Sequence, residues 1–305
     1  MSLGAIPGTG PATSPLPVIR KITARTLADL PSDRTLVMGI LNVTEDSFSD
    51  GGKYAKLDDA ISHGLRMHYG GADIIDVGGE STRPGAAPVD AKDEQARIIP
   101  VITTLVKAGA IVSVDTMHTS TARAALAAGA HIINDVSGLT HEPEMPGLIA
   151  ETGAPYVLMH RRGDATSMVT EANYTDVLHE VIEELSALRD TFVAAGVKPE
   201  QLILDPGLGF AKNAEHNWDL LRGLERFSAM GHRVLVGTSR KRFLGSLLEA
   251  DGKPATPTAR DAATVATTAL ATINGAWGVR VHDVSANLDA VKVAHAWSAA
   301  PVPAL

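Results

Sequence analysis

The stretch "AIVSVDTMHTSTARAALAAGAHIINDVS", residues 110–137, contains a complete strand–helix–strand unit. An apolar run ends at Asp115, an alanine-rich helical pattern follows, and Gly129 separates this pattern from a second apolar run. Continuously apolar runs are typical of strands that are buried on both faces, and a glycine commonly ends the helix before such a strand. This order of elements predicts two parallel strands that are joined by a crossover helix.

The same unit recurs along the chain. Further apolar runs occupy residues 35–41, 72–79, 155–160, 202–207, 233–239 and 278–284, and a helical pattern follows each of them, as at 214–227. Eight such units predict an α/β fold of the (β/α)8 TIM barrel type in a single domain. An open doubly wound sheet is the alternative, but it would need fewer units and usually carries a G-x-G-x-x-G turn, which the chain lacks. We expect a flexible Pro/Gly-rich tail over residues 1–33 and the barrel over residues 34–300.

Composition excludes several classes of function. The formal net charge is −8, which does not favour non-specific nucleic-acid binding, and the absence of cysteine excludes disulfides and thiolate chemistry. No apolar run reaches the roughly 18 residues that a membrane span needs. The first residues lack the apolar region of a signal peptide, so we expect a cytoplasmic protein.

Polar side chains follow nearly every predicted strand, at the barrel end where chemistry is usually located. The residues at these positions are Asn42, Asp76, Asp115, Asn134, Asp135, Met159 with His160, Asp205, Arg280 and His282, and all but Met159 are polar. Helix capping explains any single one equally well, and we assign Asp135 and Asp283 to it. Capping does not explain the whole set, which predicts a ligand site in the mouth of the barrel.

The set divides into two chemistries. Asp115, Asn134 and Asp205 offer two carboxylates and an amide, which suit the amino and N–H edges of a flat heterocycle. Lys241 could meet a ring carbonyl or nitrogen, and Arg280 could stack on the ring. The local alternatives are a turn at Asp205 before Pro206 and a solvated helix start at Lys241.

The second chemistry is anionic. Asn42, Arg83, Arg280 and His282, with Ser239, provide hydrogen-bond donors for phosphate oxygens. Asn42 and Asp50 could give oxygen ligands to Mg²⁺, which usually binds a diphosphate through one or two protein oxygens and waters.

These residues lie in stretches that resemble the dihydropteroate synthases of bacterial folate biosynthesis. The matching stretches are "MGILNVTEDSFSDGG" (38–52), "DIIDVGGESTRPGA" (73–86), "VSVDT" (112–116), "INDVSG" (133–138), "LMH" (158–160), "LDPGLGF" (204–210), "GTSRKRFLG" (237–245) and "GVRVHDV" (278–284). The resemblance covers residues 36–298. It implies a homodimeric transferase that joins p-aminobenzoate to 6-hydroxymethyl-7,8-dihydropterin diphosphate with Mg²⁺, along an SN1-like path, and that sulfonamides inhibit by competition.

The resemblance also implies roles for single residues. The pterin site falls on Asp115, Asn134, Met159, Asp205, Lys241 and Arg280. The diphosphate site falls on Asn42, Arg83, Arg280 and His282, with Asn42 and Asp50 for the metal. The p-aminobenzoate site falls on Phe48, Thr82, Pro84, Phe210 and Lys241. The residues implied in catalysis are Asp46, which would face the developing cation, and Asp50, Lys241, Arg280 and His282.

Three positions depart from the pattern of the family. Glu45 stands where the family often has Pro, Arg161 where it often has Met, and Arg242 where it often has Ser. Two alternatives to the synthase stay open. One is a catalytically silent pterin-binding paralogue, and the other is a methyltetrahydrofolate-binding methyltransferase barrel, which should lack "DSFSDGG" and "SRK".

Overall fold

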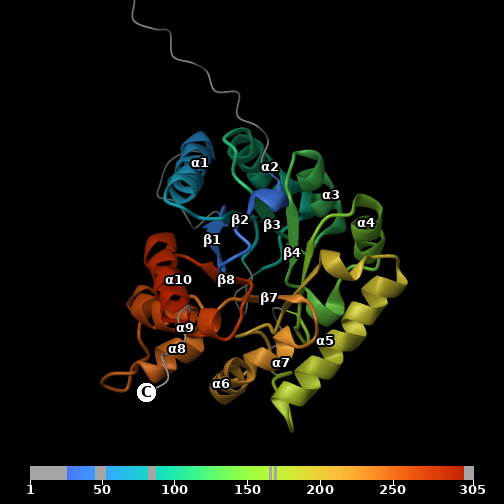
Figure 1. Ribbon diagram of the computed structural model, residues 1–305. Coiled ribbons are helices and arrows are strands. Elements are labelled where there is room, and N and C mark those ends of the chain that lie inside the picture. Colours follow the sequence, from blue (N-terminus) through green and yellow to red (C-terminus); the bar gives the residue numbers. More distant parts are fainter. Residues whose placement is uncertain (1–25, 45–52, 82–86, 165–166, 168–169, 299–305) are drawn as a thin grey trace, which may run out of the picture.

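In the computed structural model, parallel strands pair in chain order from β1 to β8, and the pairing of β1 with β8 closes them into a barrel. Helices surround this barrel on the outside (Figure 1). The structure describes residues 26–44, 53–81, 87–164, 167 and 170–298, without the side chains of residues 53–55. The predicted (β/α)8 fold is confirmed, and the open doubly wound sheet is excluded.

The elements alternate along the chain as the apolar runs predict. The strands are β1 (Leu36–Asn42), β2 (Ile74–Gly78), β3 (Val112–Asp115), β4 (Ile132–Asp135), β5 (Tyr156–Met159), β6 (Leu202–Asp205), β7 (Arg233–Val236) and β8 (Gly278–Val281). The helices are α1 (Lys53–Tyr69), α2 (Ala91–Lys107), α3 (Thr119–Ala127), α4 (Met145–Thr152), α5 (Val177–Ala194), α6 (Ala214–Arg222), α7 (Leu224–Ser228), α8 (Arg242–Leu247), α9 (Asp261–Ile273) and α10 (Val284–Ser298). Short 3-10 helices are η1 (Leu27–Asp29), η2 (Gly138–Thr140), η3 (Pro199–Gln201) and η4 (Thr258–Arg260).

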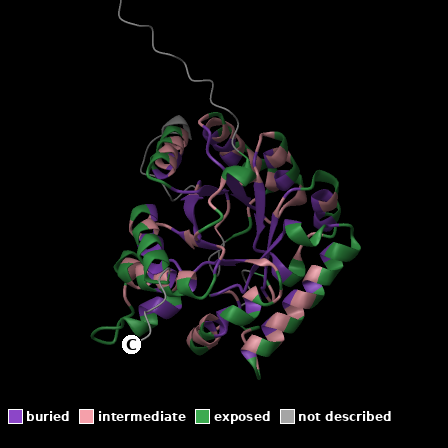
Figure 2. Cartoon of the chain, in the orientation of Figure 1, coloured by how far each residue is buried: buried purple, intermediate pink, exposed green. Residues whose placement is uncertain are grey.

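Side chains alternate between the inside of the barrel and the surrounding helices. The inner cluster is entirely apolar and consists of Leu36, Met38, Ile74, Ile111, Ile132, Val157, Ile203 and Leu235. The intervening residues, such as Val37, Ile75 and Val114, join the larger core under the helices. Figure 2 shows the strands buried and the helices exposed on their outer faces. Because alternate residues point inward, the polar residues near the ends of the strands continue the inner column into the barrel mouth.

The opposite end of the barrel is closed by apolar side chains. Leu27 and Leu30, with Trp277, pack against the inner cluster. The Arg34 guanidinium bonds both carboxylate oxygens of Asp73 at 2.8 Å, which ties the start of β1 to that of β2. The helix η1 thus lies inside the segment that we assigned to the tail, and the domain boundary at residue 33 stays a prediction.

Two glycines show how local chemistry sets the helix ends. Gly153 ends α4 in the left-handed conformation (φ 70°), as the glycine after this helical pattern predicts. The prediction of one helix over 214–227 is wrong, because the chain breaks at Gly223 into α6 and α7. A Cβ atom at Gly223 would lie 2.4 Å from Leu178 Cδ2, so a larger residue at this break would have to displace the Leu178 side chain of α5. Within the described residues, no helix has the length and apolarity that crossing a membrane would require.

Candidate functional site

Polar side chains from four strands, three of them buried, meet at the carboxyl ends of the strands. Arg280 on β8 donates from Nε to Asp76 Oδ2 at 2.6 Å and from Nη2 to Asp115 Oδ2 at 2.7 Å. Asn134 on β4 donates from Nδ2 to Asp76 Oδ2 at 2.9 Å. The four side chains therefore form one hydrogen-bonded network across the mouth of the barrel.

Burial shifts the pKa values of the charged groups in this network. Burial raises the pKa of Asp115 to about 7, the Arg280 charge opposes this shift, and Asp76 adds to it. For Arg280, burial acts to lower the pKa, but Asp76 and Asp115 raise it overall. Asp76 Oδ1 is buried and has no hydrogen-bond partner among the described residues. A carboxylate oxygen of this kind is suited to accept an N–H group of a bound heterocycle.

A second group lies on the β6–β7 side of the mouth. Asp205 ends β6, and burial raises its pKa while the nearby Lys241 charge lowers it. Lys241 donates from Nζ to the carbonyl of Leu208, and its Nζ lies 4.8 Å from the centre of the Phe210 ring. Burial lowers the pKa of Lys241 to about 8, although Asp205 opposes the shift. Met159 is buried beside Asp205 at the end of β5.

The β8–β1 side carries groups suited to an anion. His282 donates from its backbone N–H to Ser239 Oγ at 3.1 Å, and Ser239 Oγ lies 2.9 Å from His282 Nδ1. These two contacts fix the position of the His282 ring next to the loop after β7. Asn42 ends β1, which pairs with β8. An imidazole and an amide can both provide N–H donors of the kind that bind phosphate oxygens.

Other predicted residues cannot be placed in this geometry. The residues Asp46, Phe48, Asp50, Thr82, Arg83 and Pro84 lie outside the described residues, as does Glu45.

The other two positions that depart from the family pattern are described. Arg242 begins α8 and is exposed. Arg161 is 3% exposed, and its Nε donates to the carbonyl of Gly163 at 3.0 Å. Burial lowers the pKa of the Arg161 guanidinium.

Sequence reasoning missed two residues near the site, and of the two residues that it assigned to helix capping it was right about one. Asp76 was noted at a strand end but received no role, although its inward position two residues after Ile74 was a usable signal. Lys212, which donates to the Phe210 carbonyl within the loop after β6, gave no signal. Asp283 Oδ1 accepts a hydrogen bond from Ala286 N and so caps α10, as we expected. Asp135 does not cap a helix, because its carboxylate accepts from Ser137 N in a turn and from the Tyr156 hydroxyl at 2.7 Å.

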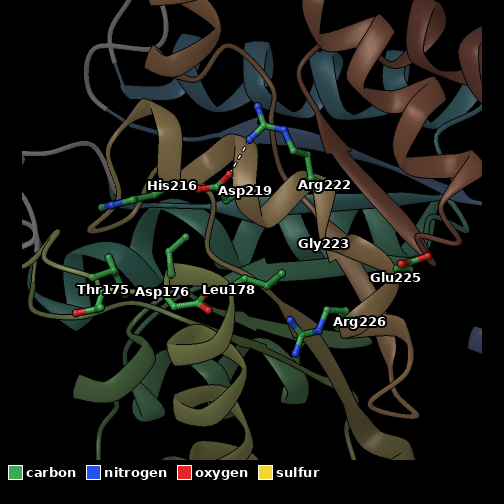
Figure 3. A pocket seen from close by; sticks show the side chains of 11 residues that line it. Thr175, Asp176, Leu178, His216, Asp219, Arg222, Gly223, Glu225 and Arg226 are labelled. Carbon is green, nitrogen blue, oxygen red and sulfur yellow. Dashed lines mark hydrogen bonds and ion pairs between the residues drawn. The ribbon is translucent and has the colours of Figure 1, made fainter.

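Two surface hollows of about 660 and 670 Å³ lie away from these strand ends. The first lies between the start of α5 and the helices α6 and α7, where Arg222 pairs with Asp219 at 2.6 Å (Figure 3). The start of α5 borders this hollow, and Asp176 caps the helix there by accepting a hydrogen bond from His179 N. The second lies at the closed end of the barrel, between η1 and Trp277. Neither hollow contains the buried polar network, so we assign the candidate active site to the barrel mouth.

A barrel with this mouth is typical of enzymes that bind a flat, polar heterocycle, and the comparisons with known proteins define the class. Residues 38–282 match the family of pterin binding enzymes. The chain is 54% identical over 263 residues to the dihydropteroate synthase of Mycobacterium leprae, which covers 86% of this chain and 93% of that protein. It is 47% identical to the enzyme of Synechocystis over 92% of this chain and 94% of that protein.

Solved structures give the same result. A Xanthomonas albilineans dihydropteroate synthase with 4-aminobenzoic acid superimposes with a TM-score of 0.81 at 43% identity, over 89% of this chain and 96% of that chain. A Yersinia pestis dihydropteroate synthase with a sulfonamide drug gives 0.82 at 40% identity, over 89% and 97%. Within the pterin binding enzymes, the chain therefore belongs to the dihydropteroate synthases, which are transferases of folate biosynthesis.

Proposed function

We propose that this chain joins 6-hydroxymethyl-7,8-dihydropterin diphosphate to p-aminobenzoate, which forms 7,8-dihydropteroate and releases diphosphate. The observation that carries the proposal is the hydrogen-bonded network of Asp76, Asp115, Asn134 and Arg280 at the strand ends. Related enzymes of Xanthomonas albilineans have been solved with 4-aminobenzoic acid and with 7,8-dihydropteroate. These ligands are a substrate and the product of the proposed reaction.

The pterin ring is bound by the inward groups at the strand ends. Asp115 and Asp205 accept hydrogen bonds from the amino and N–H groups of the ring, and the amide of Asn134 bonds its edge. Lys241 donates to a ring nitrogen or carbonyl, Met159 contacts the ring, and Arg280 stacks on it. The buried positions of Asp115, Asn134 and Asp205 support this assignment, because water then competes little for these groups.

The diphosphate is bound on the β8–β1 side of the mouth. Asn42, Arg83, Arg280 and His282 donate to its oxygens, and the pairing of β1 with β8 supports this assignment because Asn42 and Arg280 lie on these two strands. Among the described residues, no group of three or more acidic or histidine side chains could hold a metal. Mg²⁺ commonly needs only one or two protein oxygens when phosphates supply others, so Asn42 fits such a site, with Asp50 as its proposed second ligand. Bound Mg²⁺ would offset negative charge on the diphosphate.

The reaction breaks the bond between the pterin methylene and a diphosphate oxygen. The electron-rich ring stabilises the methylene cation, Asp46 faces this cation, and Arg280 and His282 stabilise the charge on the departing diphosphate. The amine of p-aminobenzoate then forms the new C–N bond, and its surplus proton passes to a diphosphate oxygen or to solvent. The site must exclude water, which would otherwise trap the cation.

The p-aminobenzoate site is formed by Phe48, Thr82, Pro84, Phe210 and Lys241. The contact between the Lys241 ammonium and the Phe210 ring supports this proposal, because it places a cation and an aromatic face beside Asp205. Sulfonamides would occupy the same site as competitors, by analogy with the drug complex of the Yersinia pestis enzyme.

We further propose that the chain forms a homodimer through the face of α8, α9 and α10. These three helices carry large exposed apolar side chains, which are Leu247, Leu270, Ile273, Val293 and Trp297. The helices α9 and α10 lie side by side, with α8 next to them (Figure 1). Clustered apolar exposure of this kind marks interfaces.

A cytoplasmic location stays a prediction from the sequence.

Incubation of the purified chain with pterin diphosphate, p-aminobenzoate and Mg²⁺ tests the proposed reaction. We expect release of diphosphate together with 7,8-dihydropteroate, and an Asp205→Asn variant should bind the pterin at least about tenfold more weakly, since it loses a charged acceptor. Pterin binding without diphosphate release would instead indicate the silent paralogue. Transfer of a methyl group from methyltetrahydrofolate would indicate the methyltransferase.

A further inference from the structure

The turn between β6 and α6, residues 206–213, has a strained backbone. Gly207 and Gly209 have φ values of 68° and 78°, and Ala211, which is only 2% exposed, has a φ of 47°. Residues other than glycine adopt this region at a cost of about 1–3 kcal/mol, and they do so only where their surroundings impose it. The strained Ala211 directly follows Phe210, whose ring contacts Lys241.

Lys212 supplies much of the constraint on this turn. Its Nζ donates to the Phe210 carbonyl at 3.0 Å and to His160 Nδ1 at 3.0 Å, with the His160 carbonyl at 3.5 Å. The second lysine, Lys241, bonds the Leu208 carbonyl of the same turn. Two lysines thus hold neighbouring carbonyls of one turn. Burial lowers the pKa of Lys212 to about 7, and the Asp205 charge opposes this shift.

His160 is held as a neutral acceptor for Lys212. The ring is fully buried, and burial together with the Lys212 charge lowers its pKa to about 4. Its Nε2 lies 2.9 Å from Glu184 Oε2 on α5, and Arg162 Nε donates to the same carboxylate at 3.0 Å. Because the carboxylate accepts from Nε2–H, Nδ1 keeps the lone pair that Lys212 needs. A chain of contacts therefore runs from α5 to the turn.

We propose that Lys212 is a positioning residue for p-aminobenzoate, which acts by fixing the backbone of Phe210 and so the place of its ring beside Lys241. This inference rests on the proposed function, and it assigns to Lys212 no contact with either substrate. Without the ammonium, the Phe210 carbonyl loses its donor and the turn can relax the strain at Ala211.

The test compares Lys212→Met with the wild-type enzyme. We expect KM for p-aminobenzoate to rise about tenfold, with kcat and the affinity for the pterin substrate each within about threefold, because the bonds of the ammonium to the Phe210 carbonyl and to His160 are lost outside the pterin site. In a Phe210→Ala background, Lys212→Met should have little further effect on this KM, since both changes act through the same ring. Lys253→Met, which changes an exposed lysine, should leave all values unchanged.

Amide hydrogen exchange provides a readout that does not depend on activity. The amides of residues 207–210 should exchange faster in Lys212→Met, while those of β3 and β4 stay protected. Unchanged exchange with unchanged KM would overturn the proposal, and so would equal losses of pterin and p-aminobenzoate affinity. If Lys212→Met does not fold, Lys212→Gln repeats both measurements, because its side chain is one bond too short to reach the same carbonyl. A wild-type chain that released no diphosphate would overturn the proposed function, while the exchange comparison would still test the role of Lys212 in the turn.

Discussion

At the scale of single residues, the barrel mouth holds several charged groups in positions where burial imposes a large desolvation penalty. Arg280 serves two carboxylates that are almost fully buried, Asp76 and Asp115. Buried ion pairs of this kind contribute little to net stability, since desolvation offsets their attraction, but breaking one leaves a costly unpaired charge. The arrangement is therefore best explained by ligand binding, because it keeps acceptors fixed in place before the pterin arrives.

Asp115 should make stability depend on pH in a direction that can be tested. Its pKa is raised from 3.8 in a free side chain to about 7 in the folded protein, so the folded state holds a proton that the unfolded state has lost. Stability from this group is present below pH 4 and is lost as the pH rises to about 7. In Asp115→Asn this loss of stability with rising pH is absent. The Tm of the variant minus the Tm of the wild type should therefore be larger at pH 8 than at pH 5, by a few °C.

Thermal unfolding of both proteins at the two pH values measures this difference. Asp289→Asn, which changes an exposed carboxylate on α10, serves as the control and should give the same Tm difference at both pH values. A Tm difference for Asp115→Asn that did not vary with pH would contradict the raised pKa.

At the scale of elements, the loops after the strands hold the functional side chains through contacts with the backbone. The loop after β7 places Arg240 in the left-handed region (φ 58°), and Arg240 pairs with Asp261 at 2.7 Å and 2.8 Å just before Lys241. In the loop after β6, Gly207 N donates to Asp205 Oδ1 at 2.7 Å. The turn at Asp205 that we considered as an alternative to ligand binding thus coexists with its place in the site.

Gly207 offers a sharp test of the β6 turn. A Cβ atom there would lie 1.8 Å from the His160 carbonyl oxygen, so Gly207→Ala must displace the turn or the end of β5. Gly231 has a similar φ of 79° but no atom within 4 Å of its Cβ position. Gly231→Ala should therefore cost only about 1 kcal/mol for the backbone conformation, whereas Gly207→Ala should cost several times more and weaken p-aminobenzoate binding.

Chemical denaturation and a KM for p-aminobenzoate, measured for both variants, check this prediction. Equal effects of the two substitutions would mean that the backbone conformation alone, and not the close approach of His160, decides the behaviour of the turn.

At the scale of the whole molecule, the elements that repeat along the chain could be predicted from the sequence. Contacts between particular residues that lie far apart in the sequence could not. Apolar runs and polar strand ends repeat along the chain, so the barrel and the inward placement of Asp115, Asn134 and Asp205 follow from local pattern. The contact of Lys212 with His160 joins residues 52 positions apart, and Asp76 meets Arg280 across 204 positions. Such pairs depend on the register of the closed sheet and on side-chain geometry, which hydrophobic periodicity does not encode.

The proposed homodimer is a property of the whole molecule, and it predicts a change in mass. Val293 is 63% exposed on α10, so Val293→Asp should leave the fold intact but place a charge in the interface, which must then be desolvated without a partner. Light scattering at about 10 µM should give a dimer for the wild type and a monomer for this variant. Val193→Asp, which changes an exposed valine on α5, should remain dimeric. A monomeric wild type, or a Val293→Asp variant that stayed dimeric, would show that α10 does not form the interface.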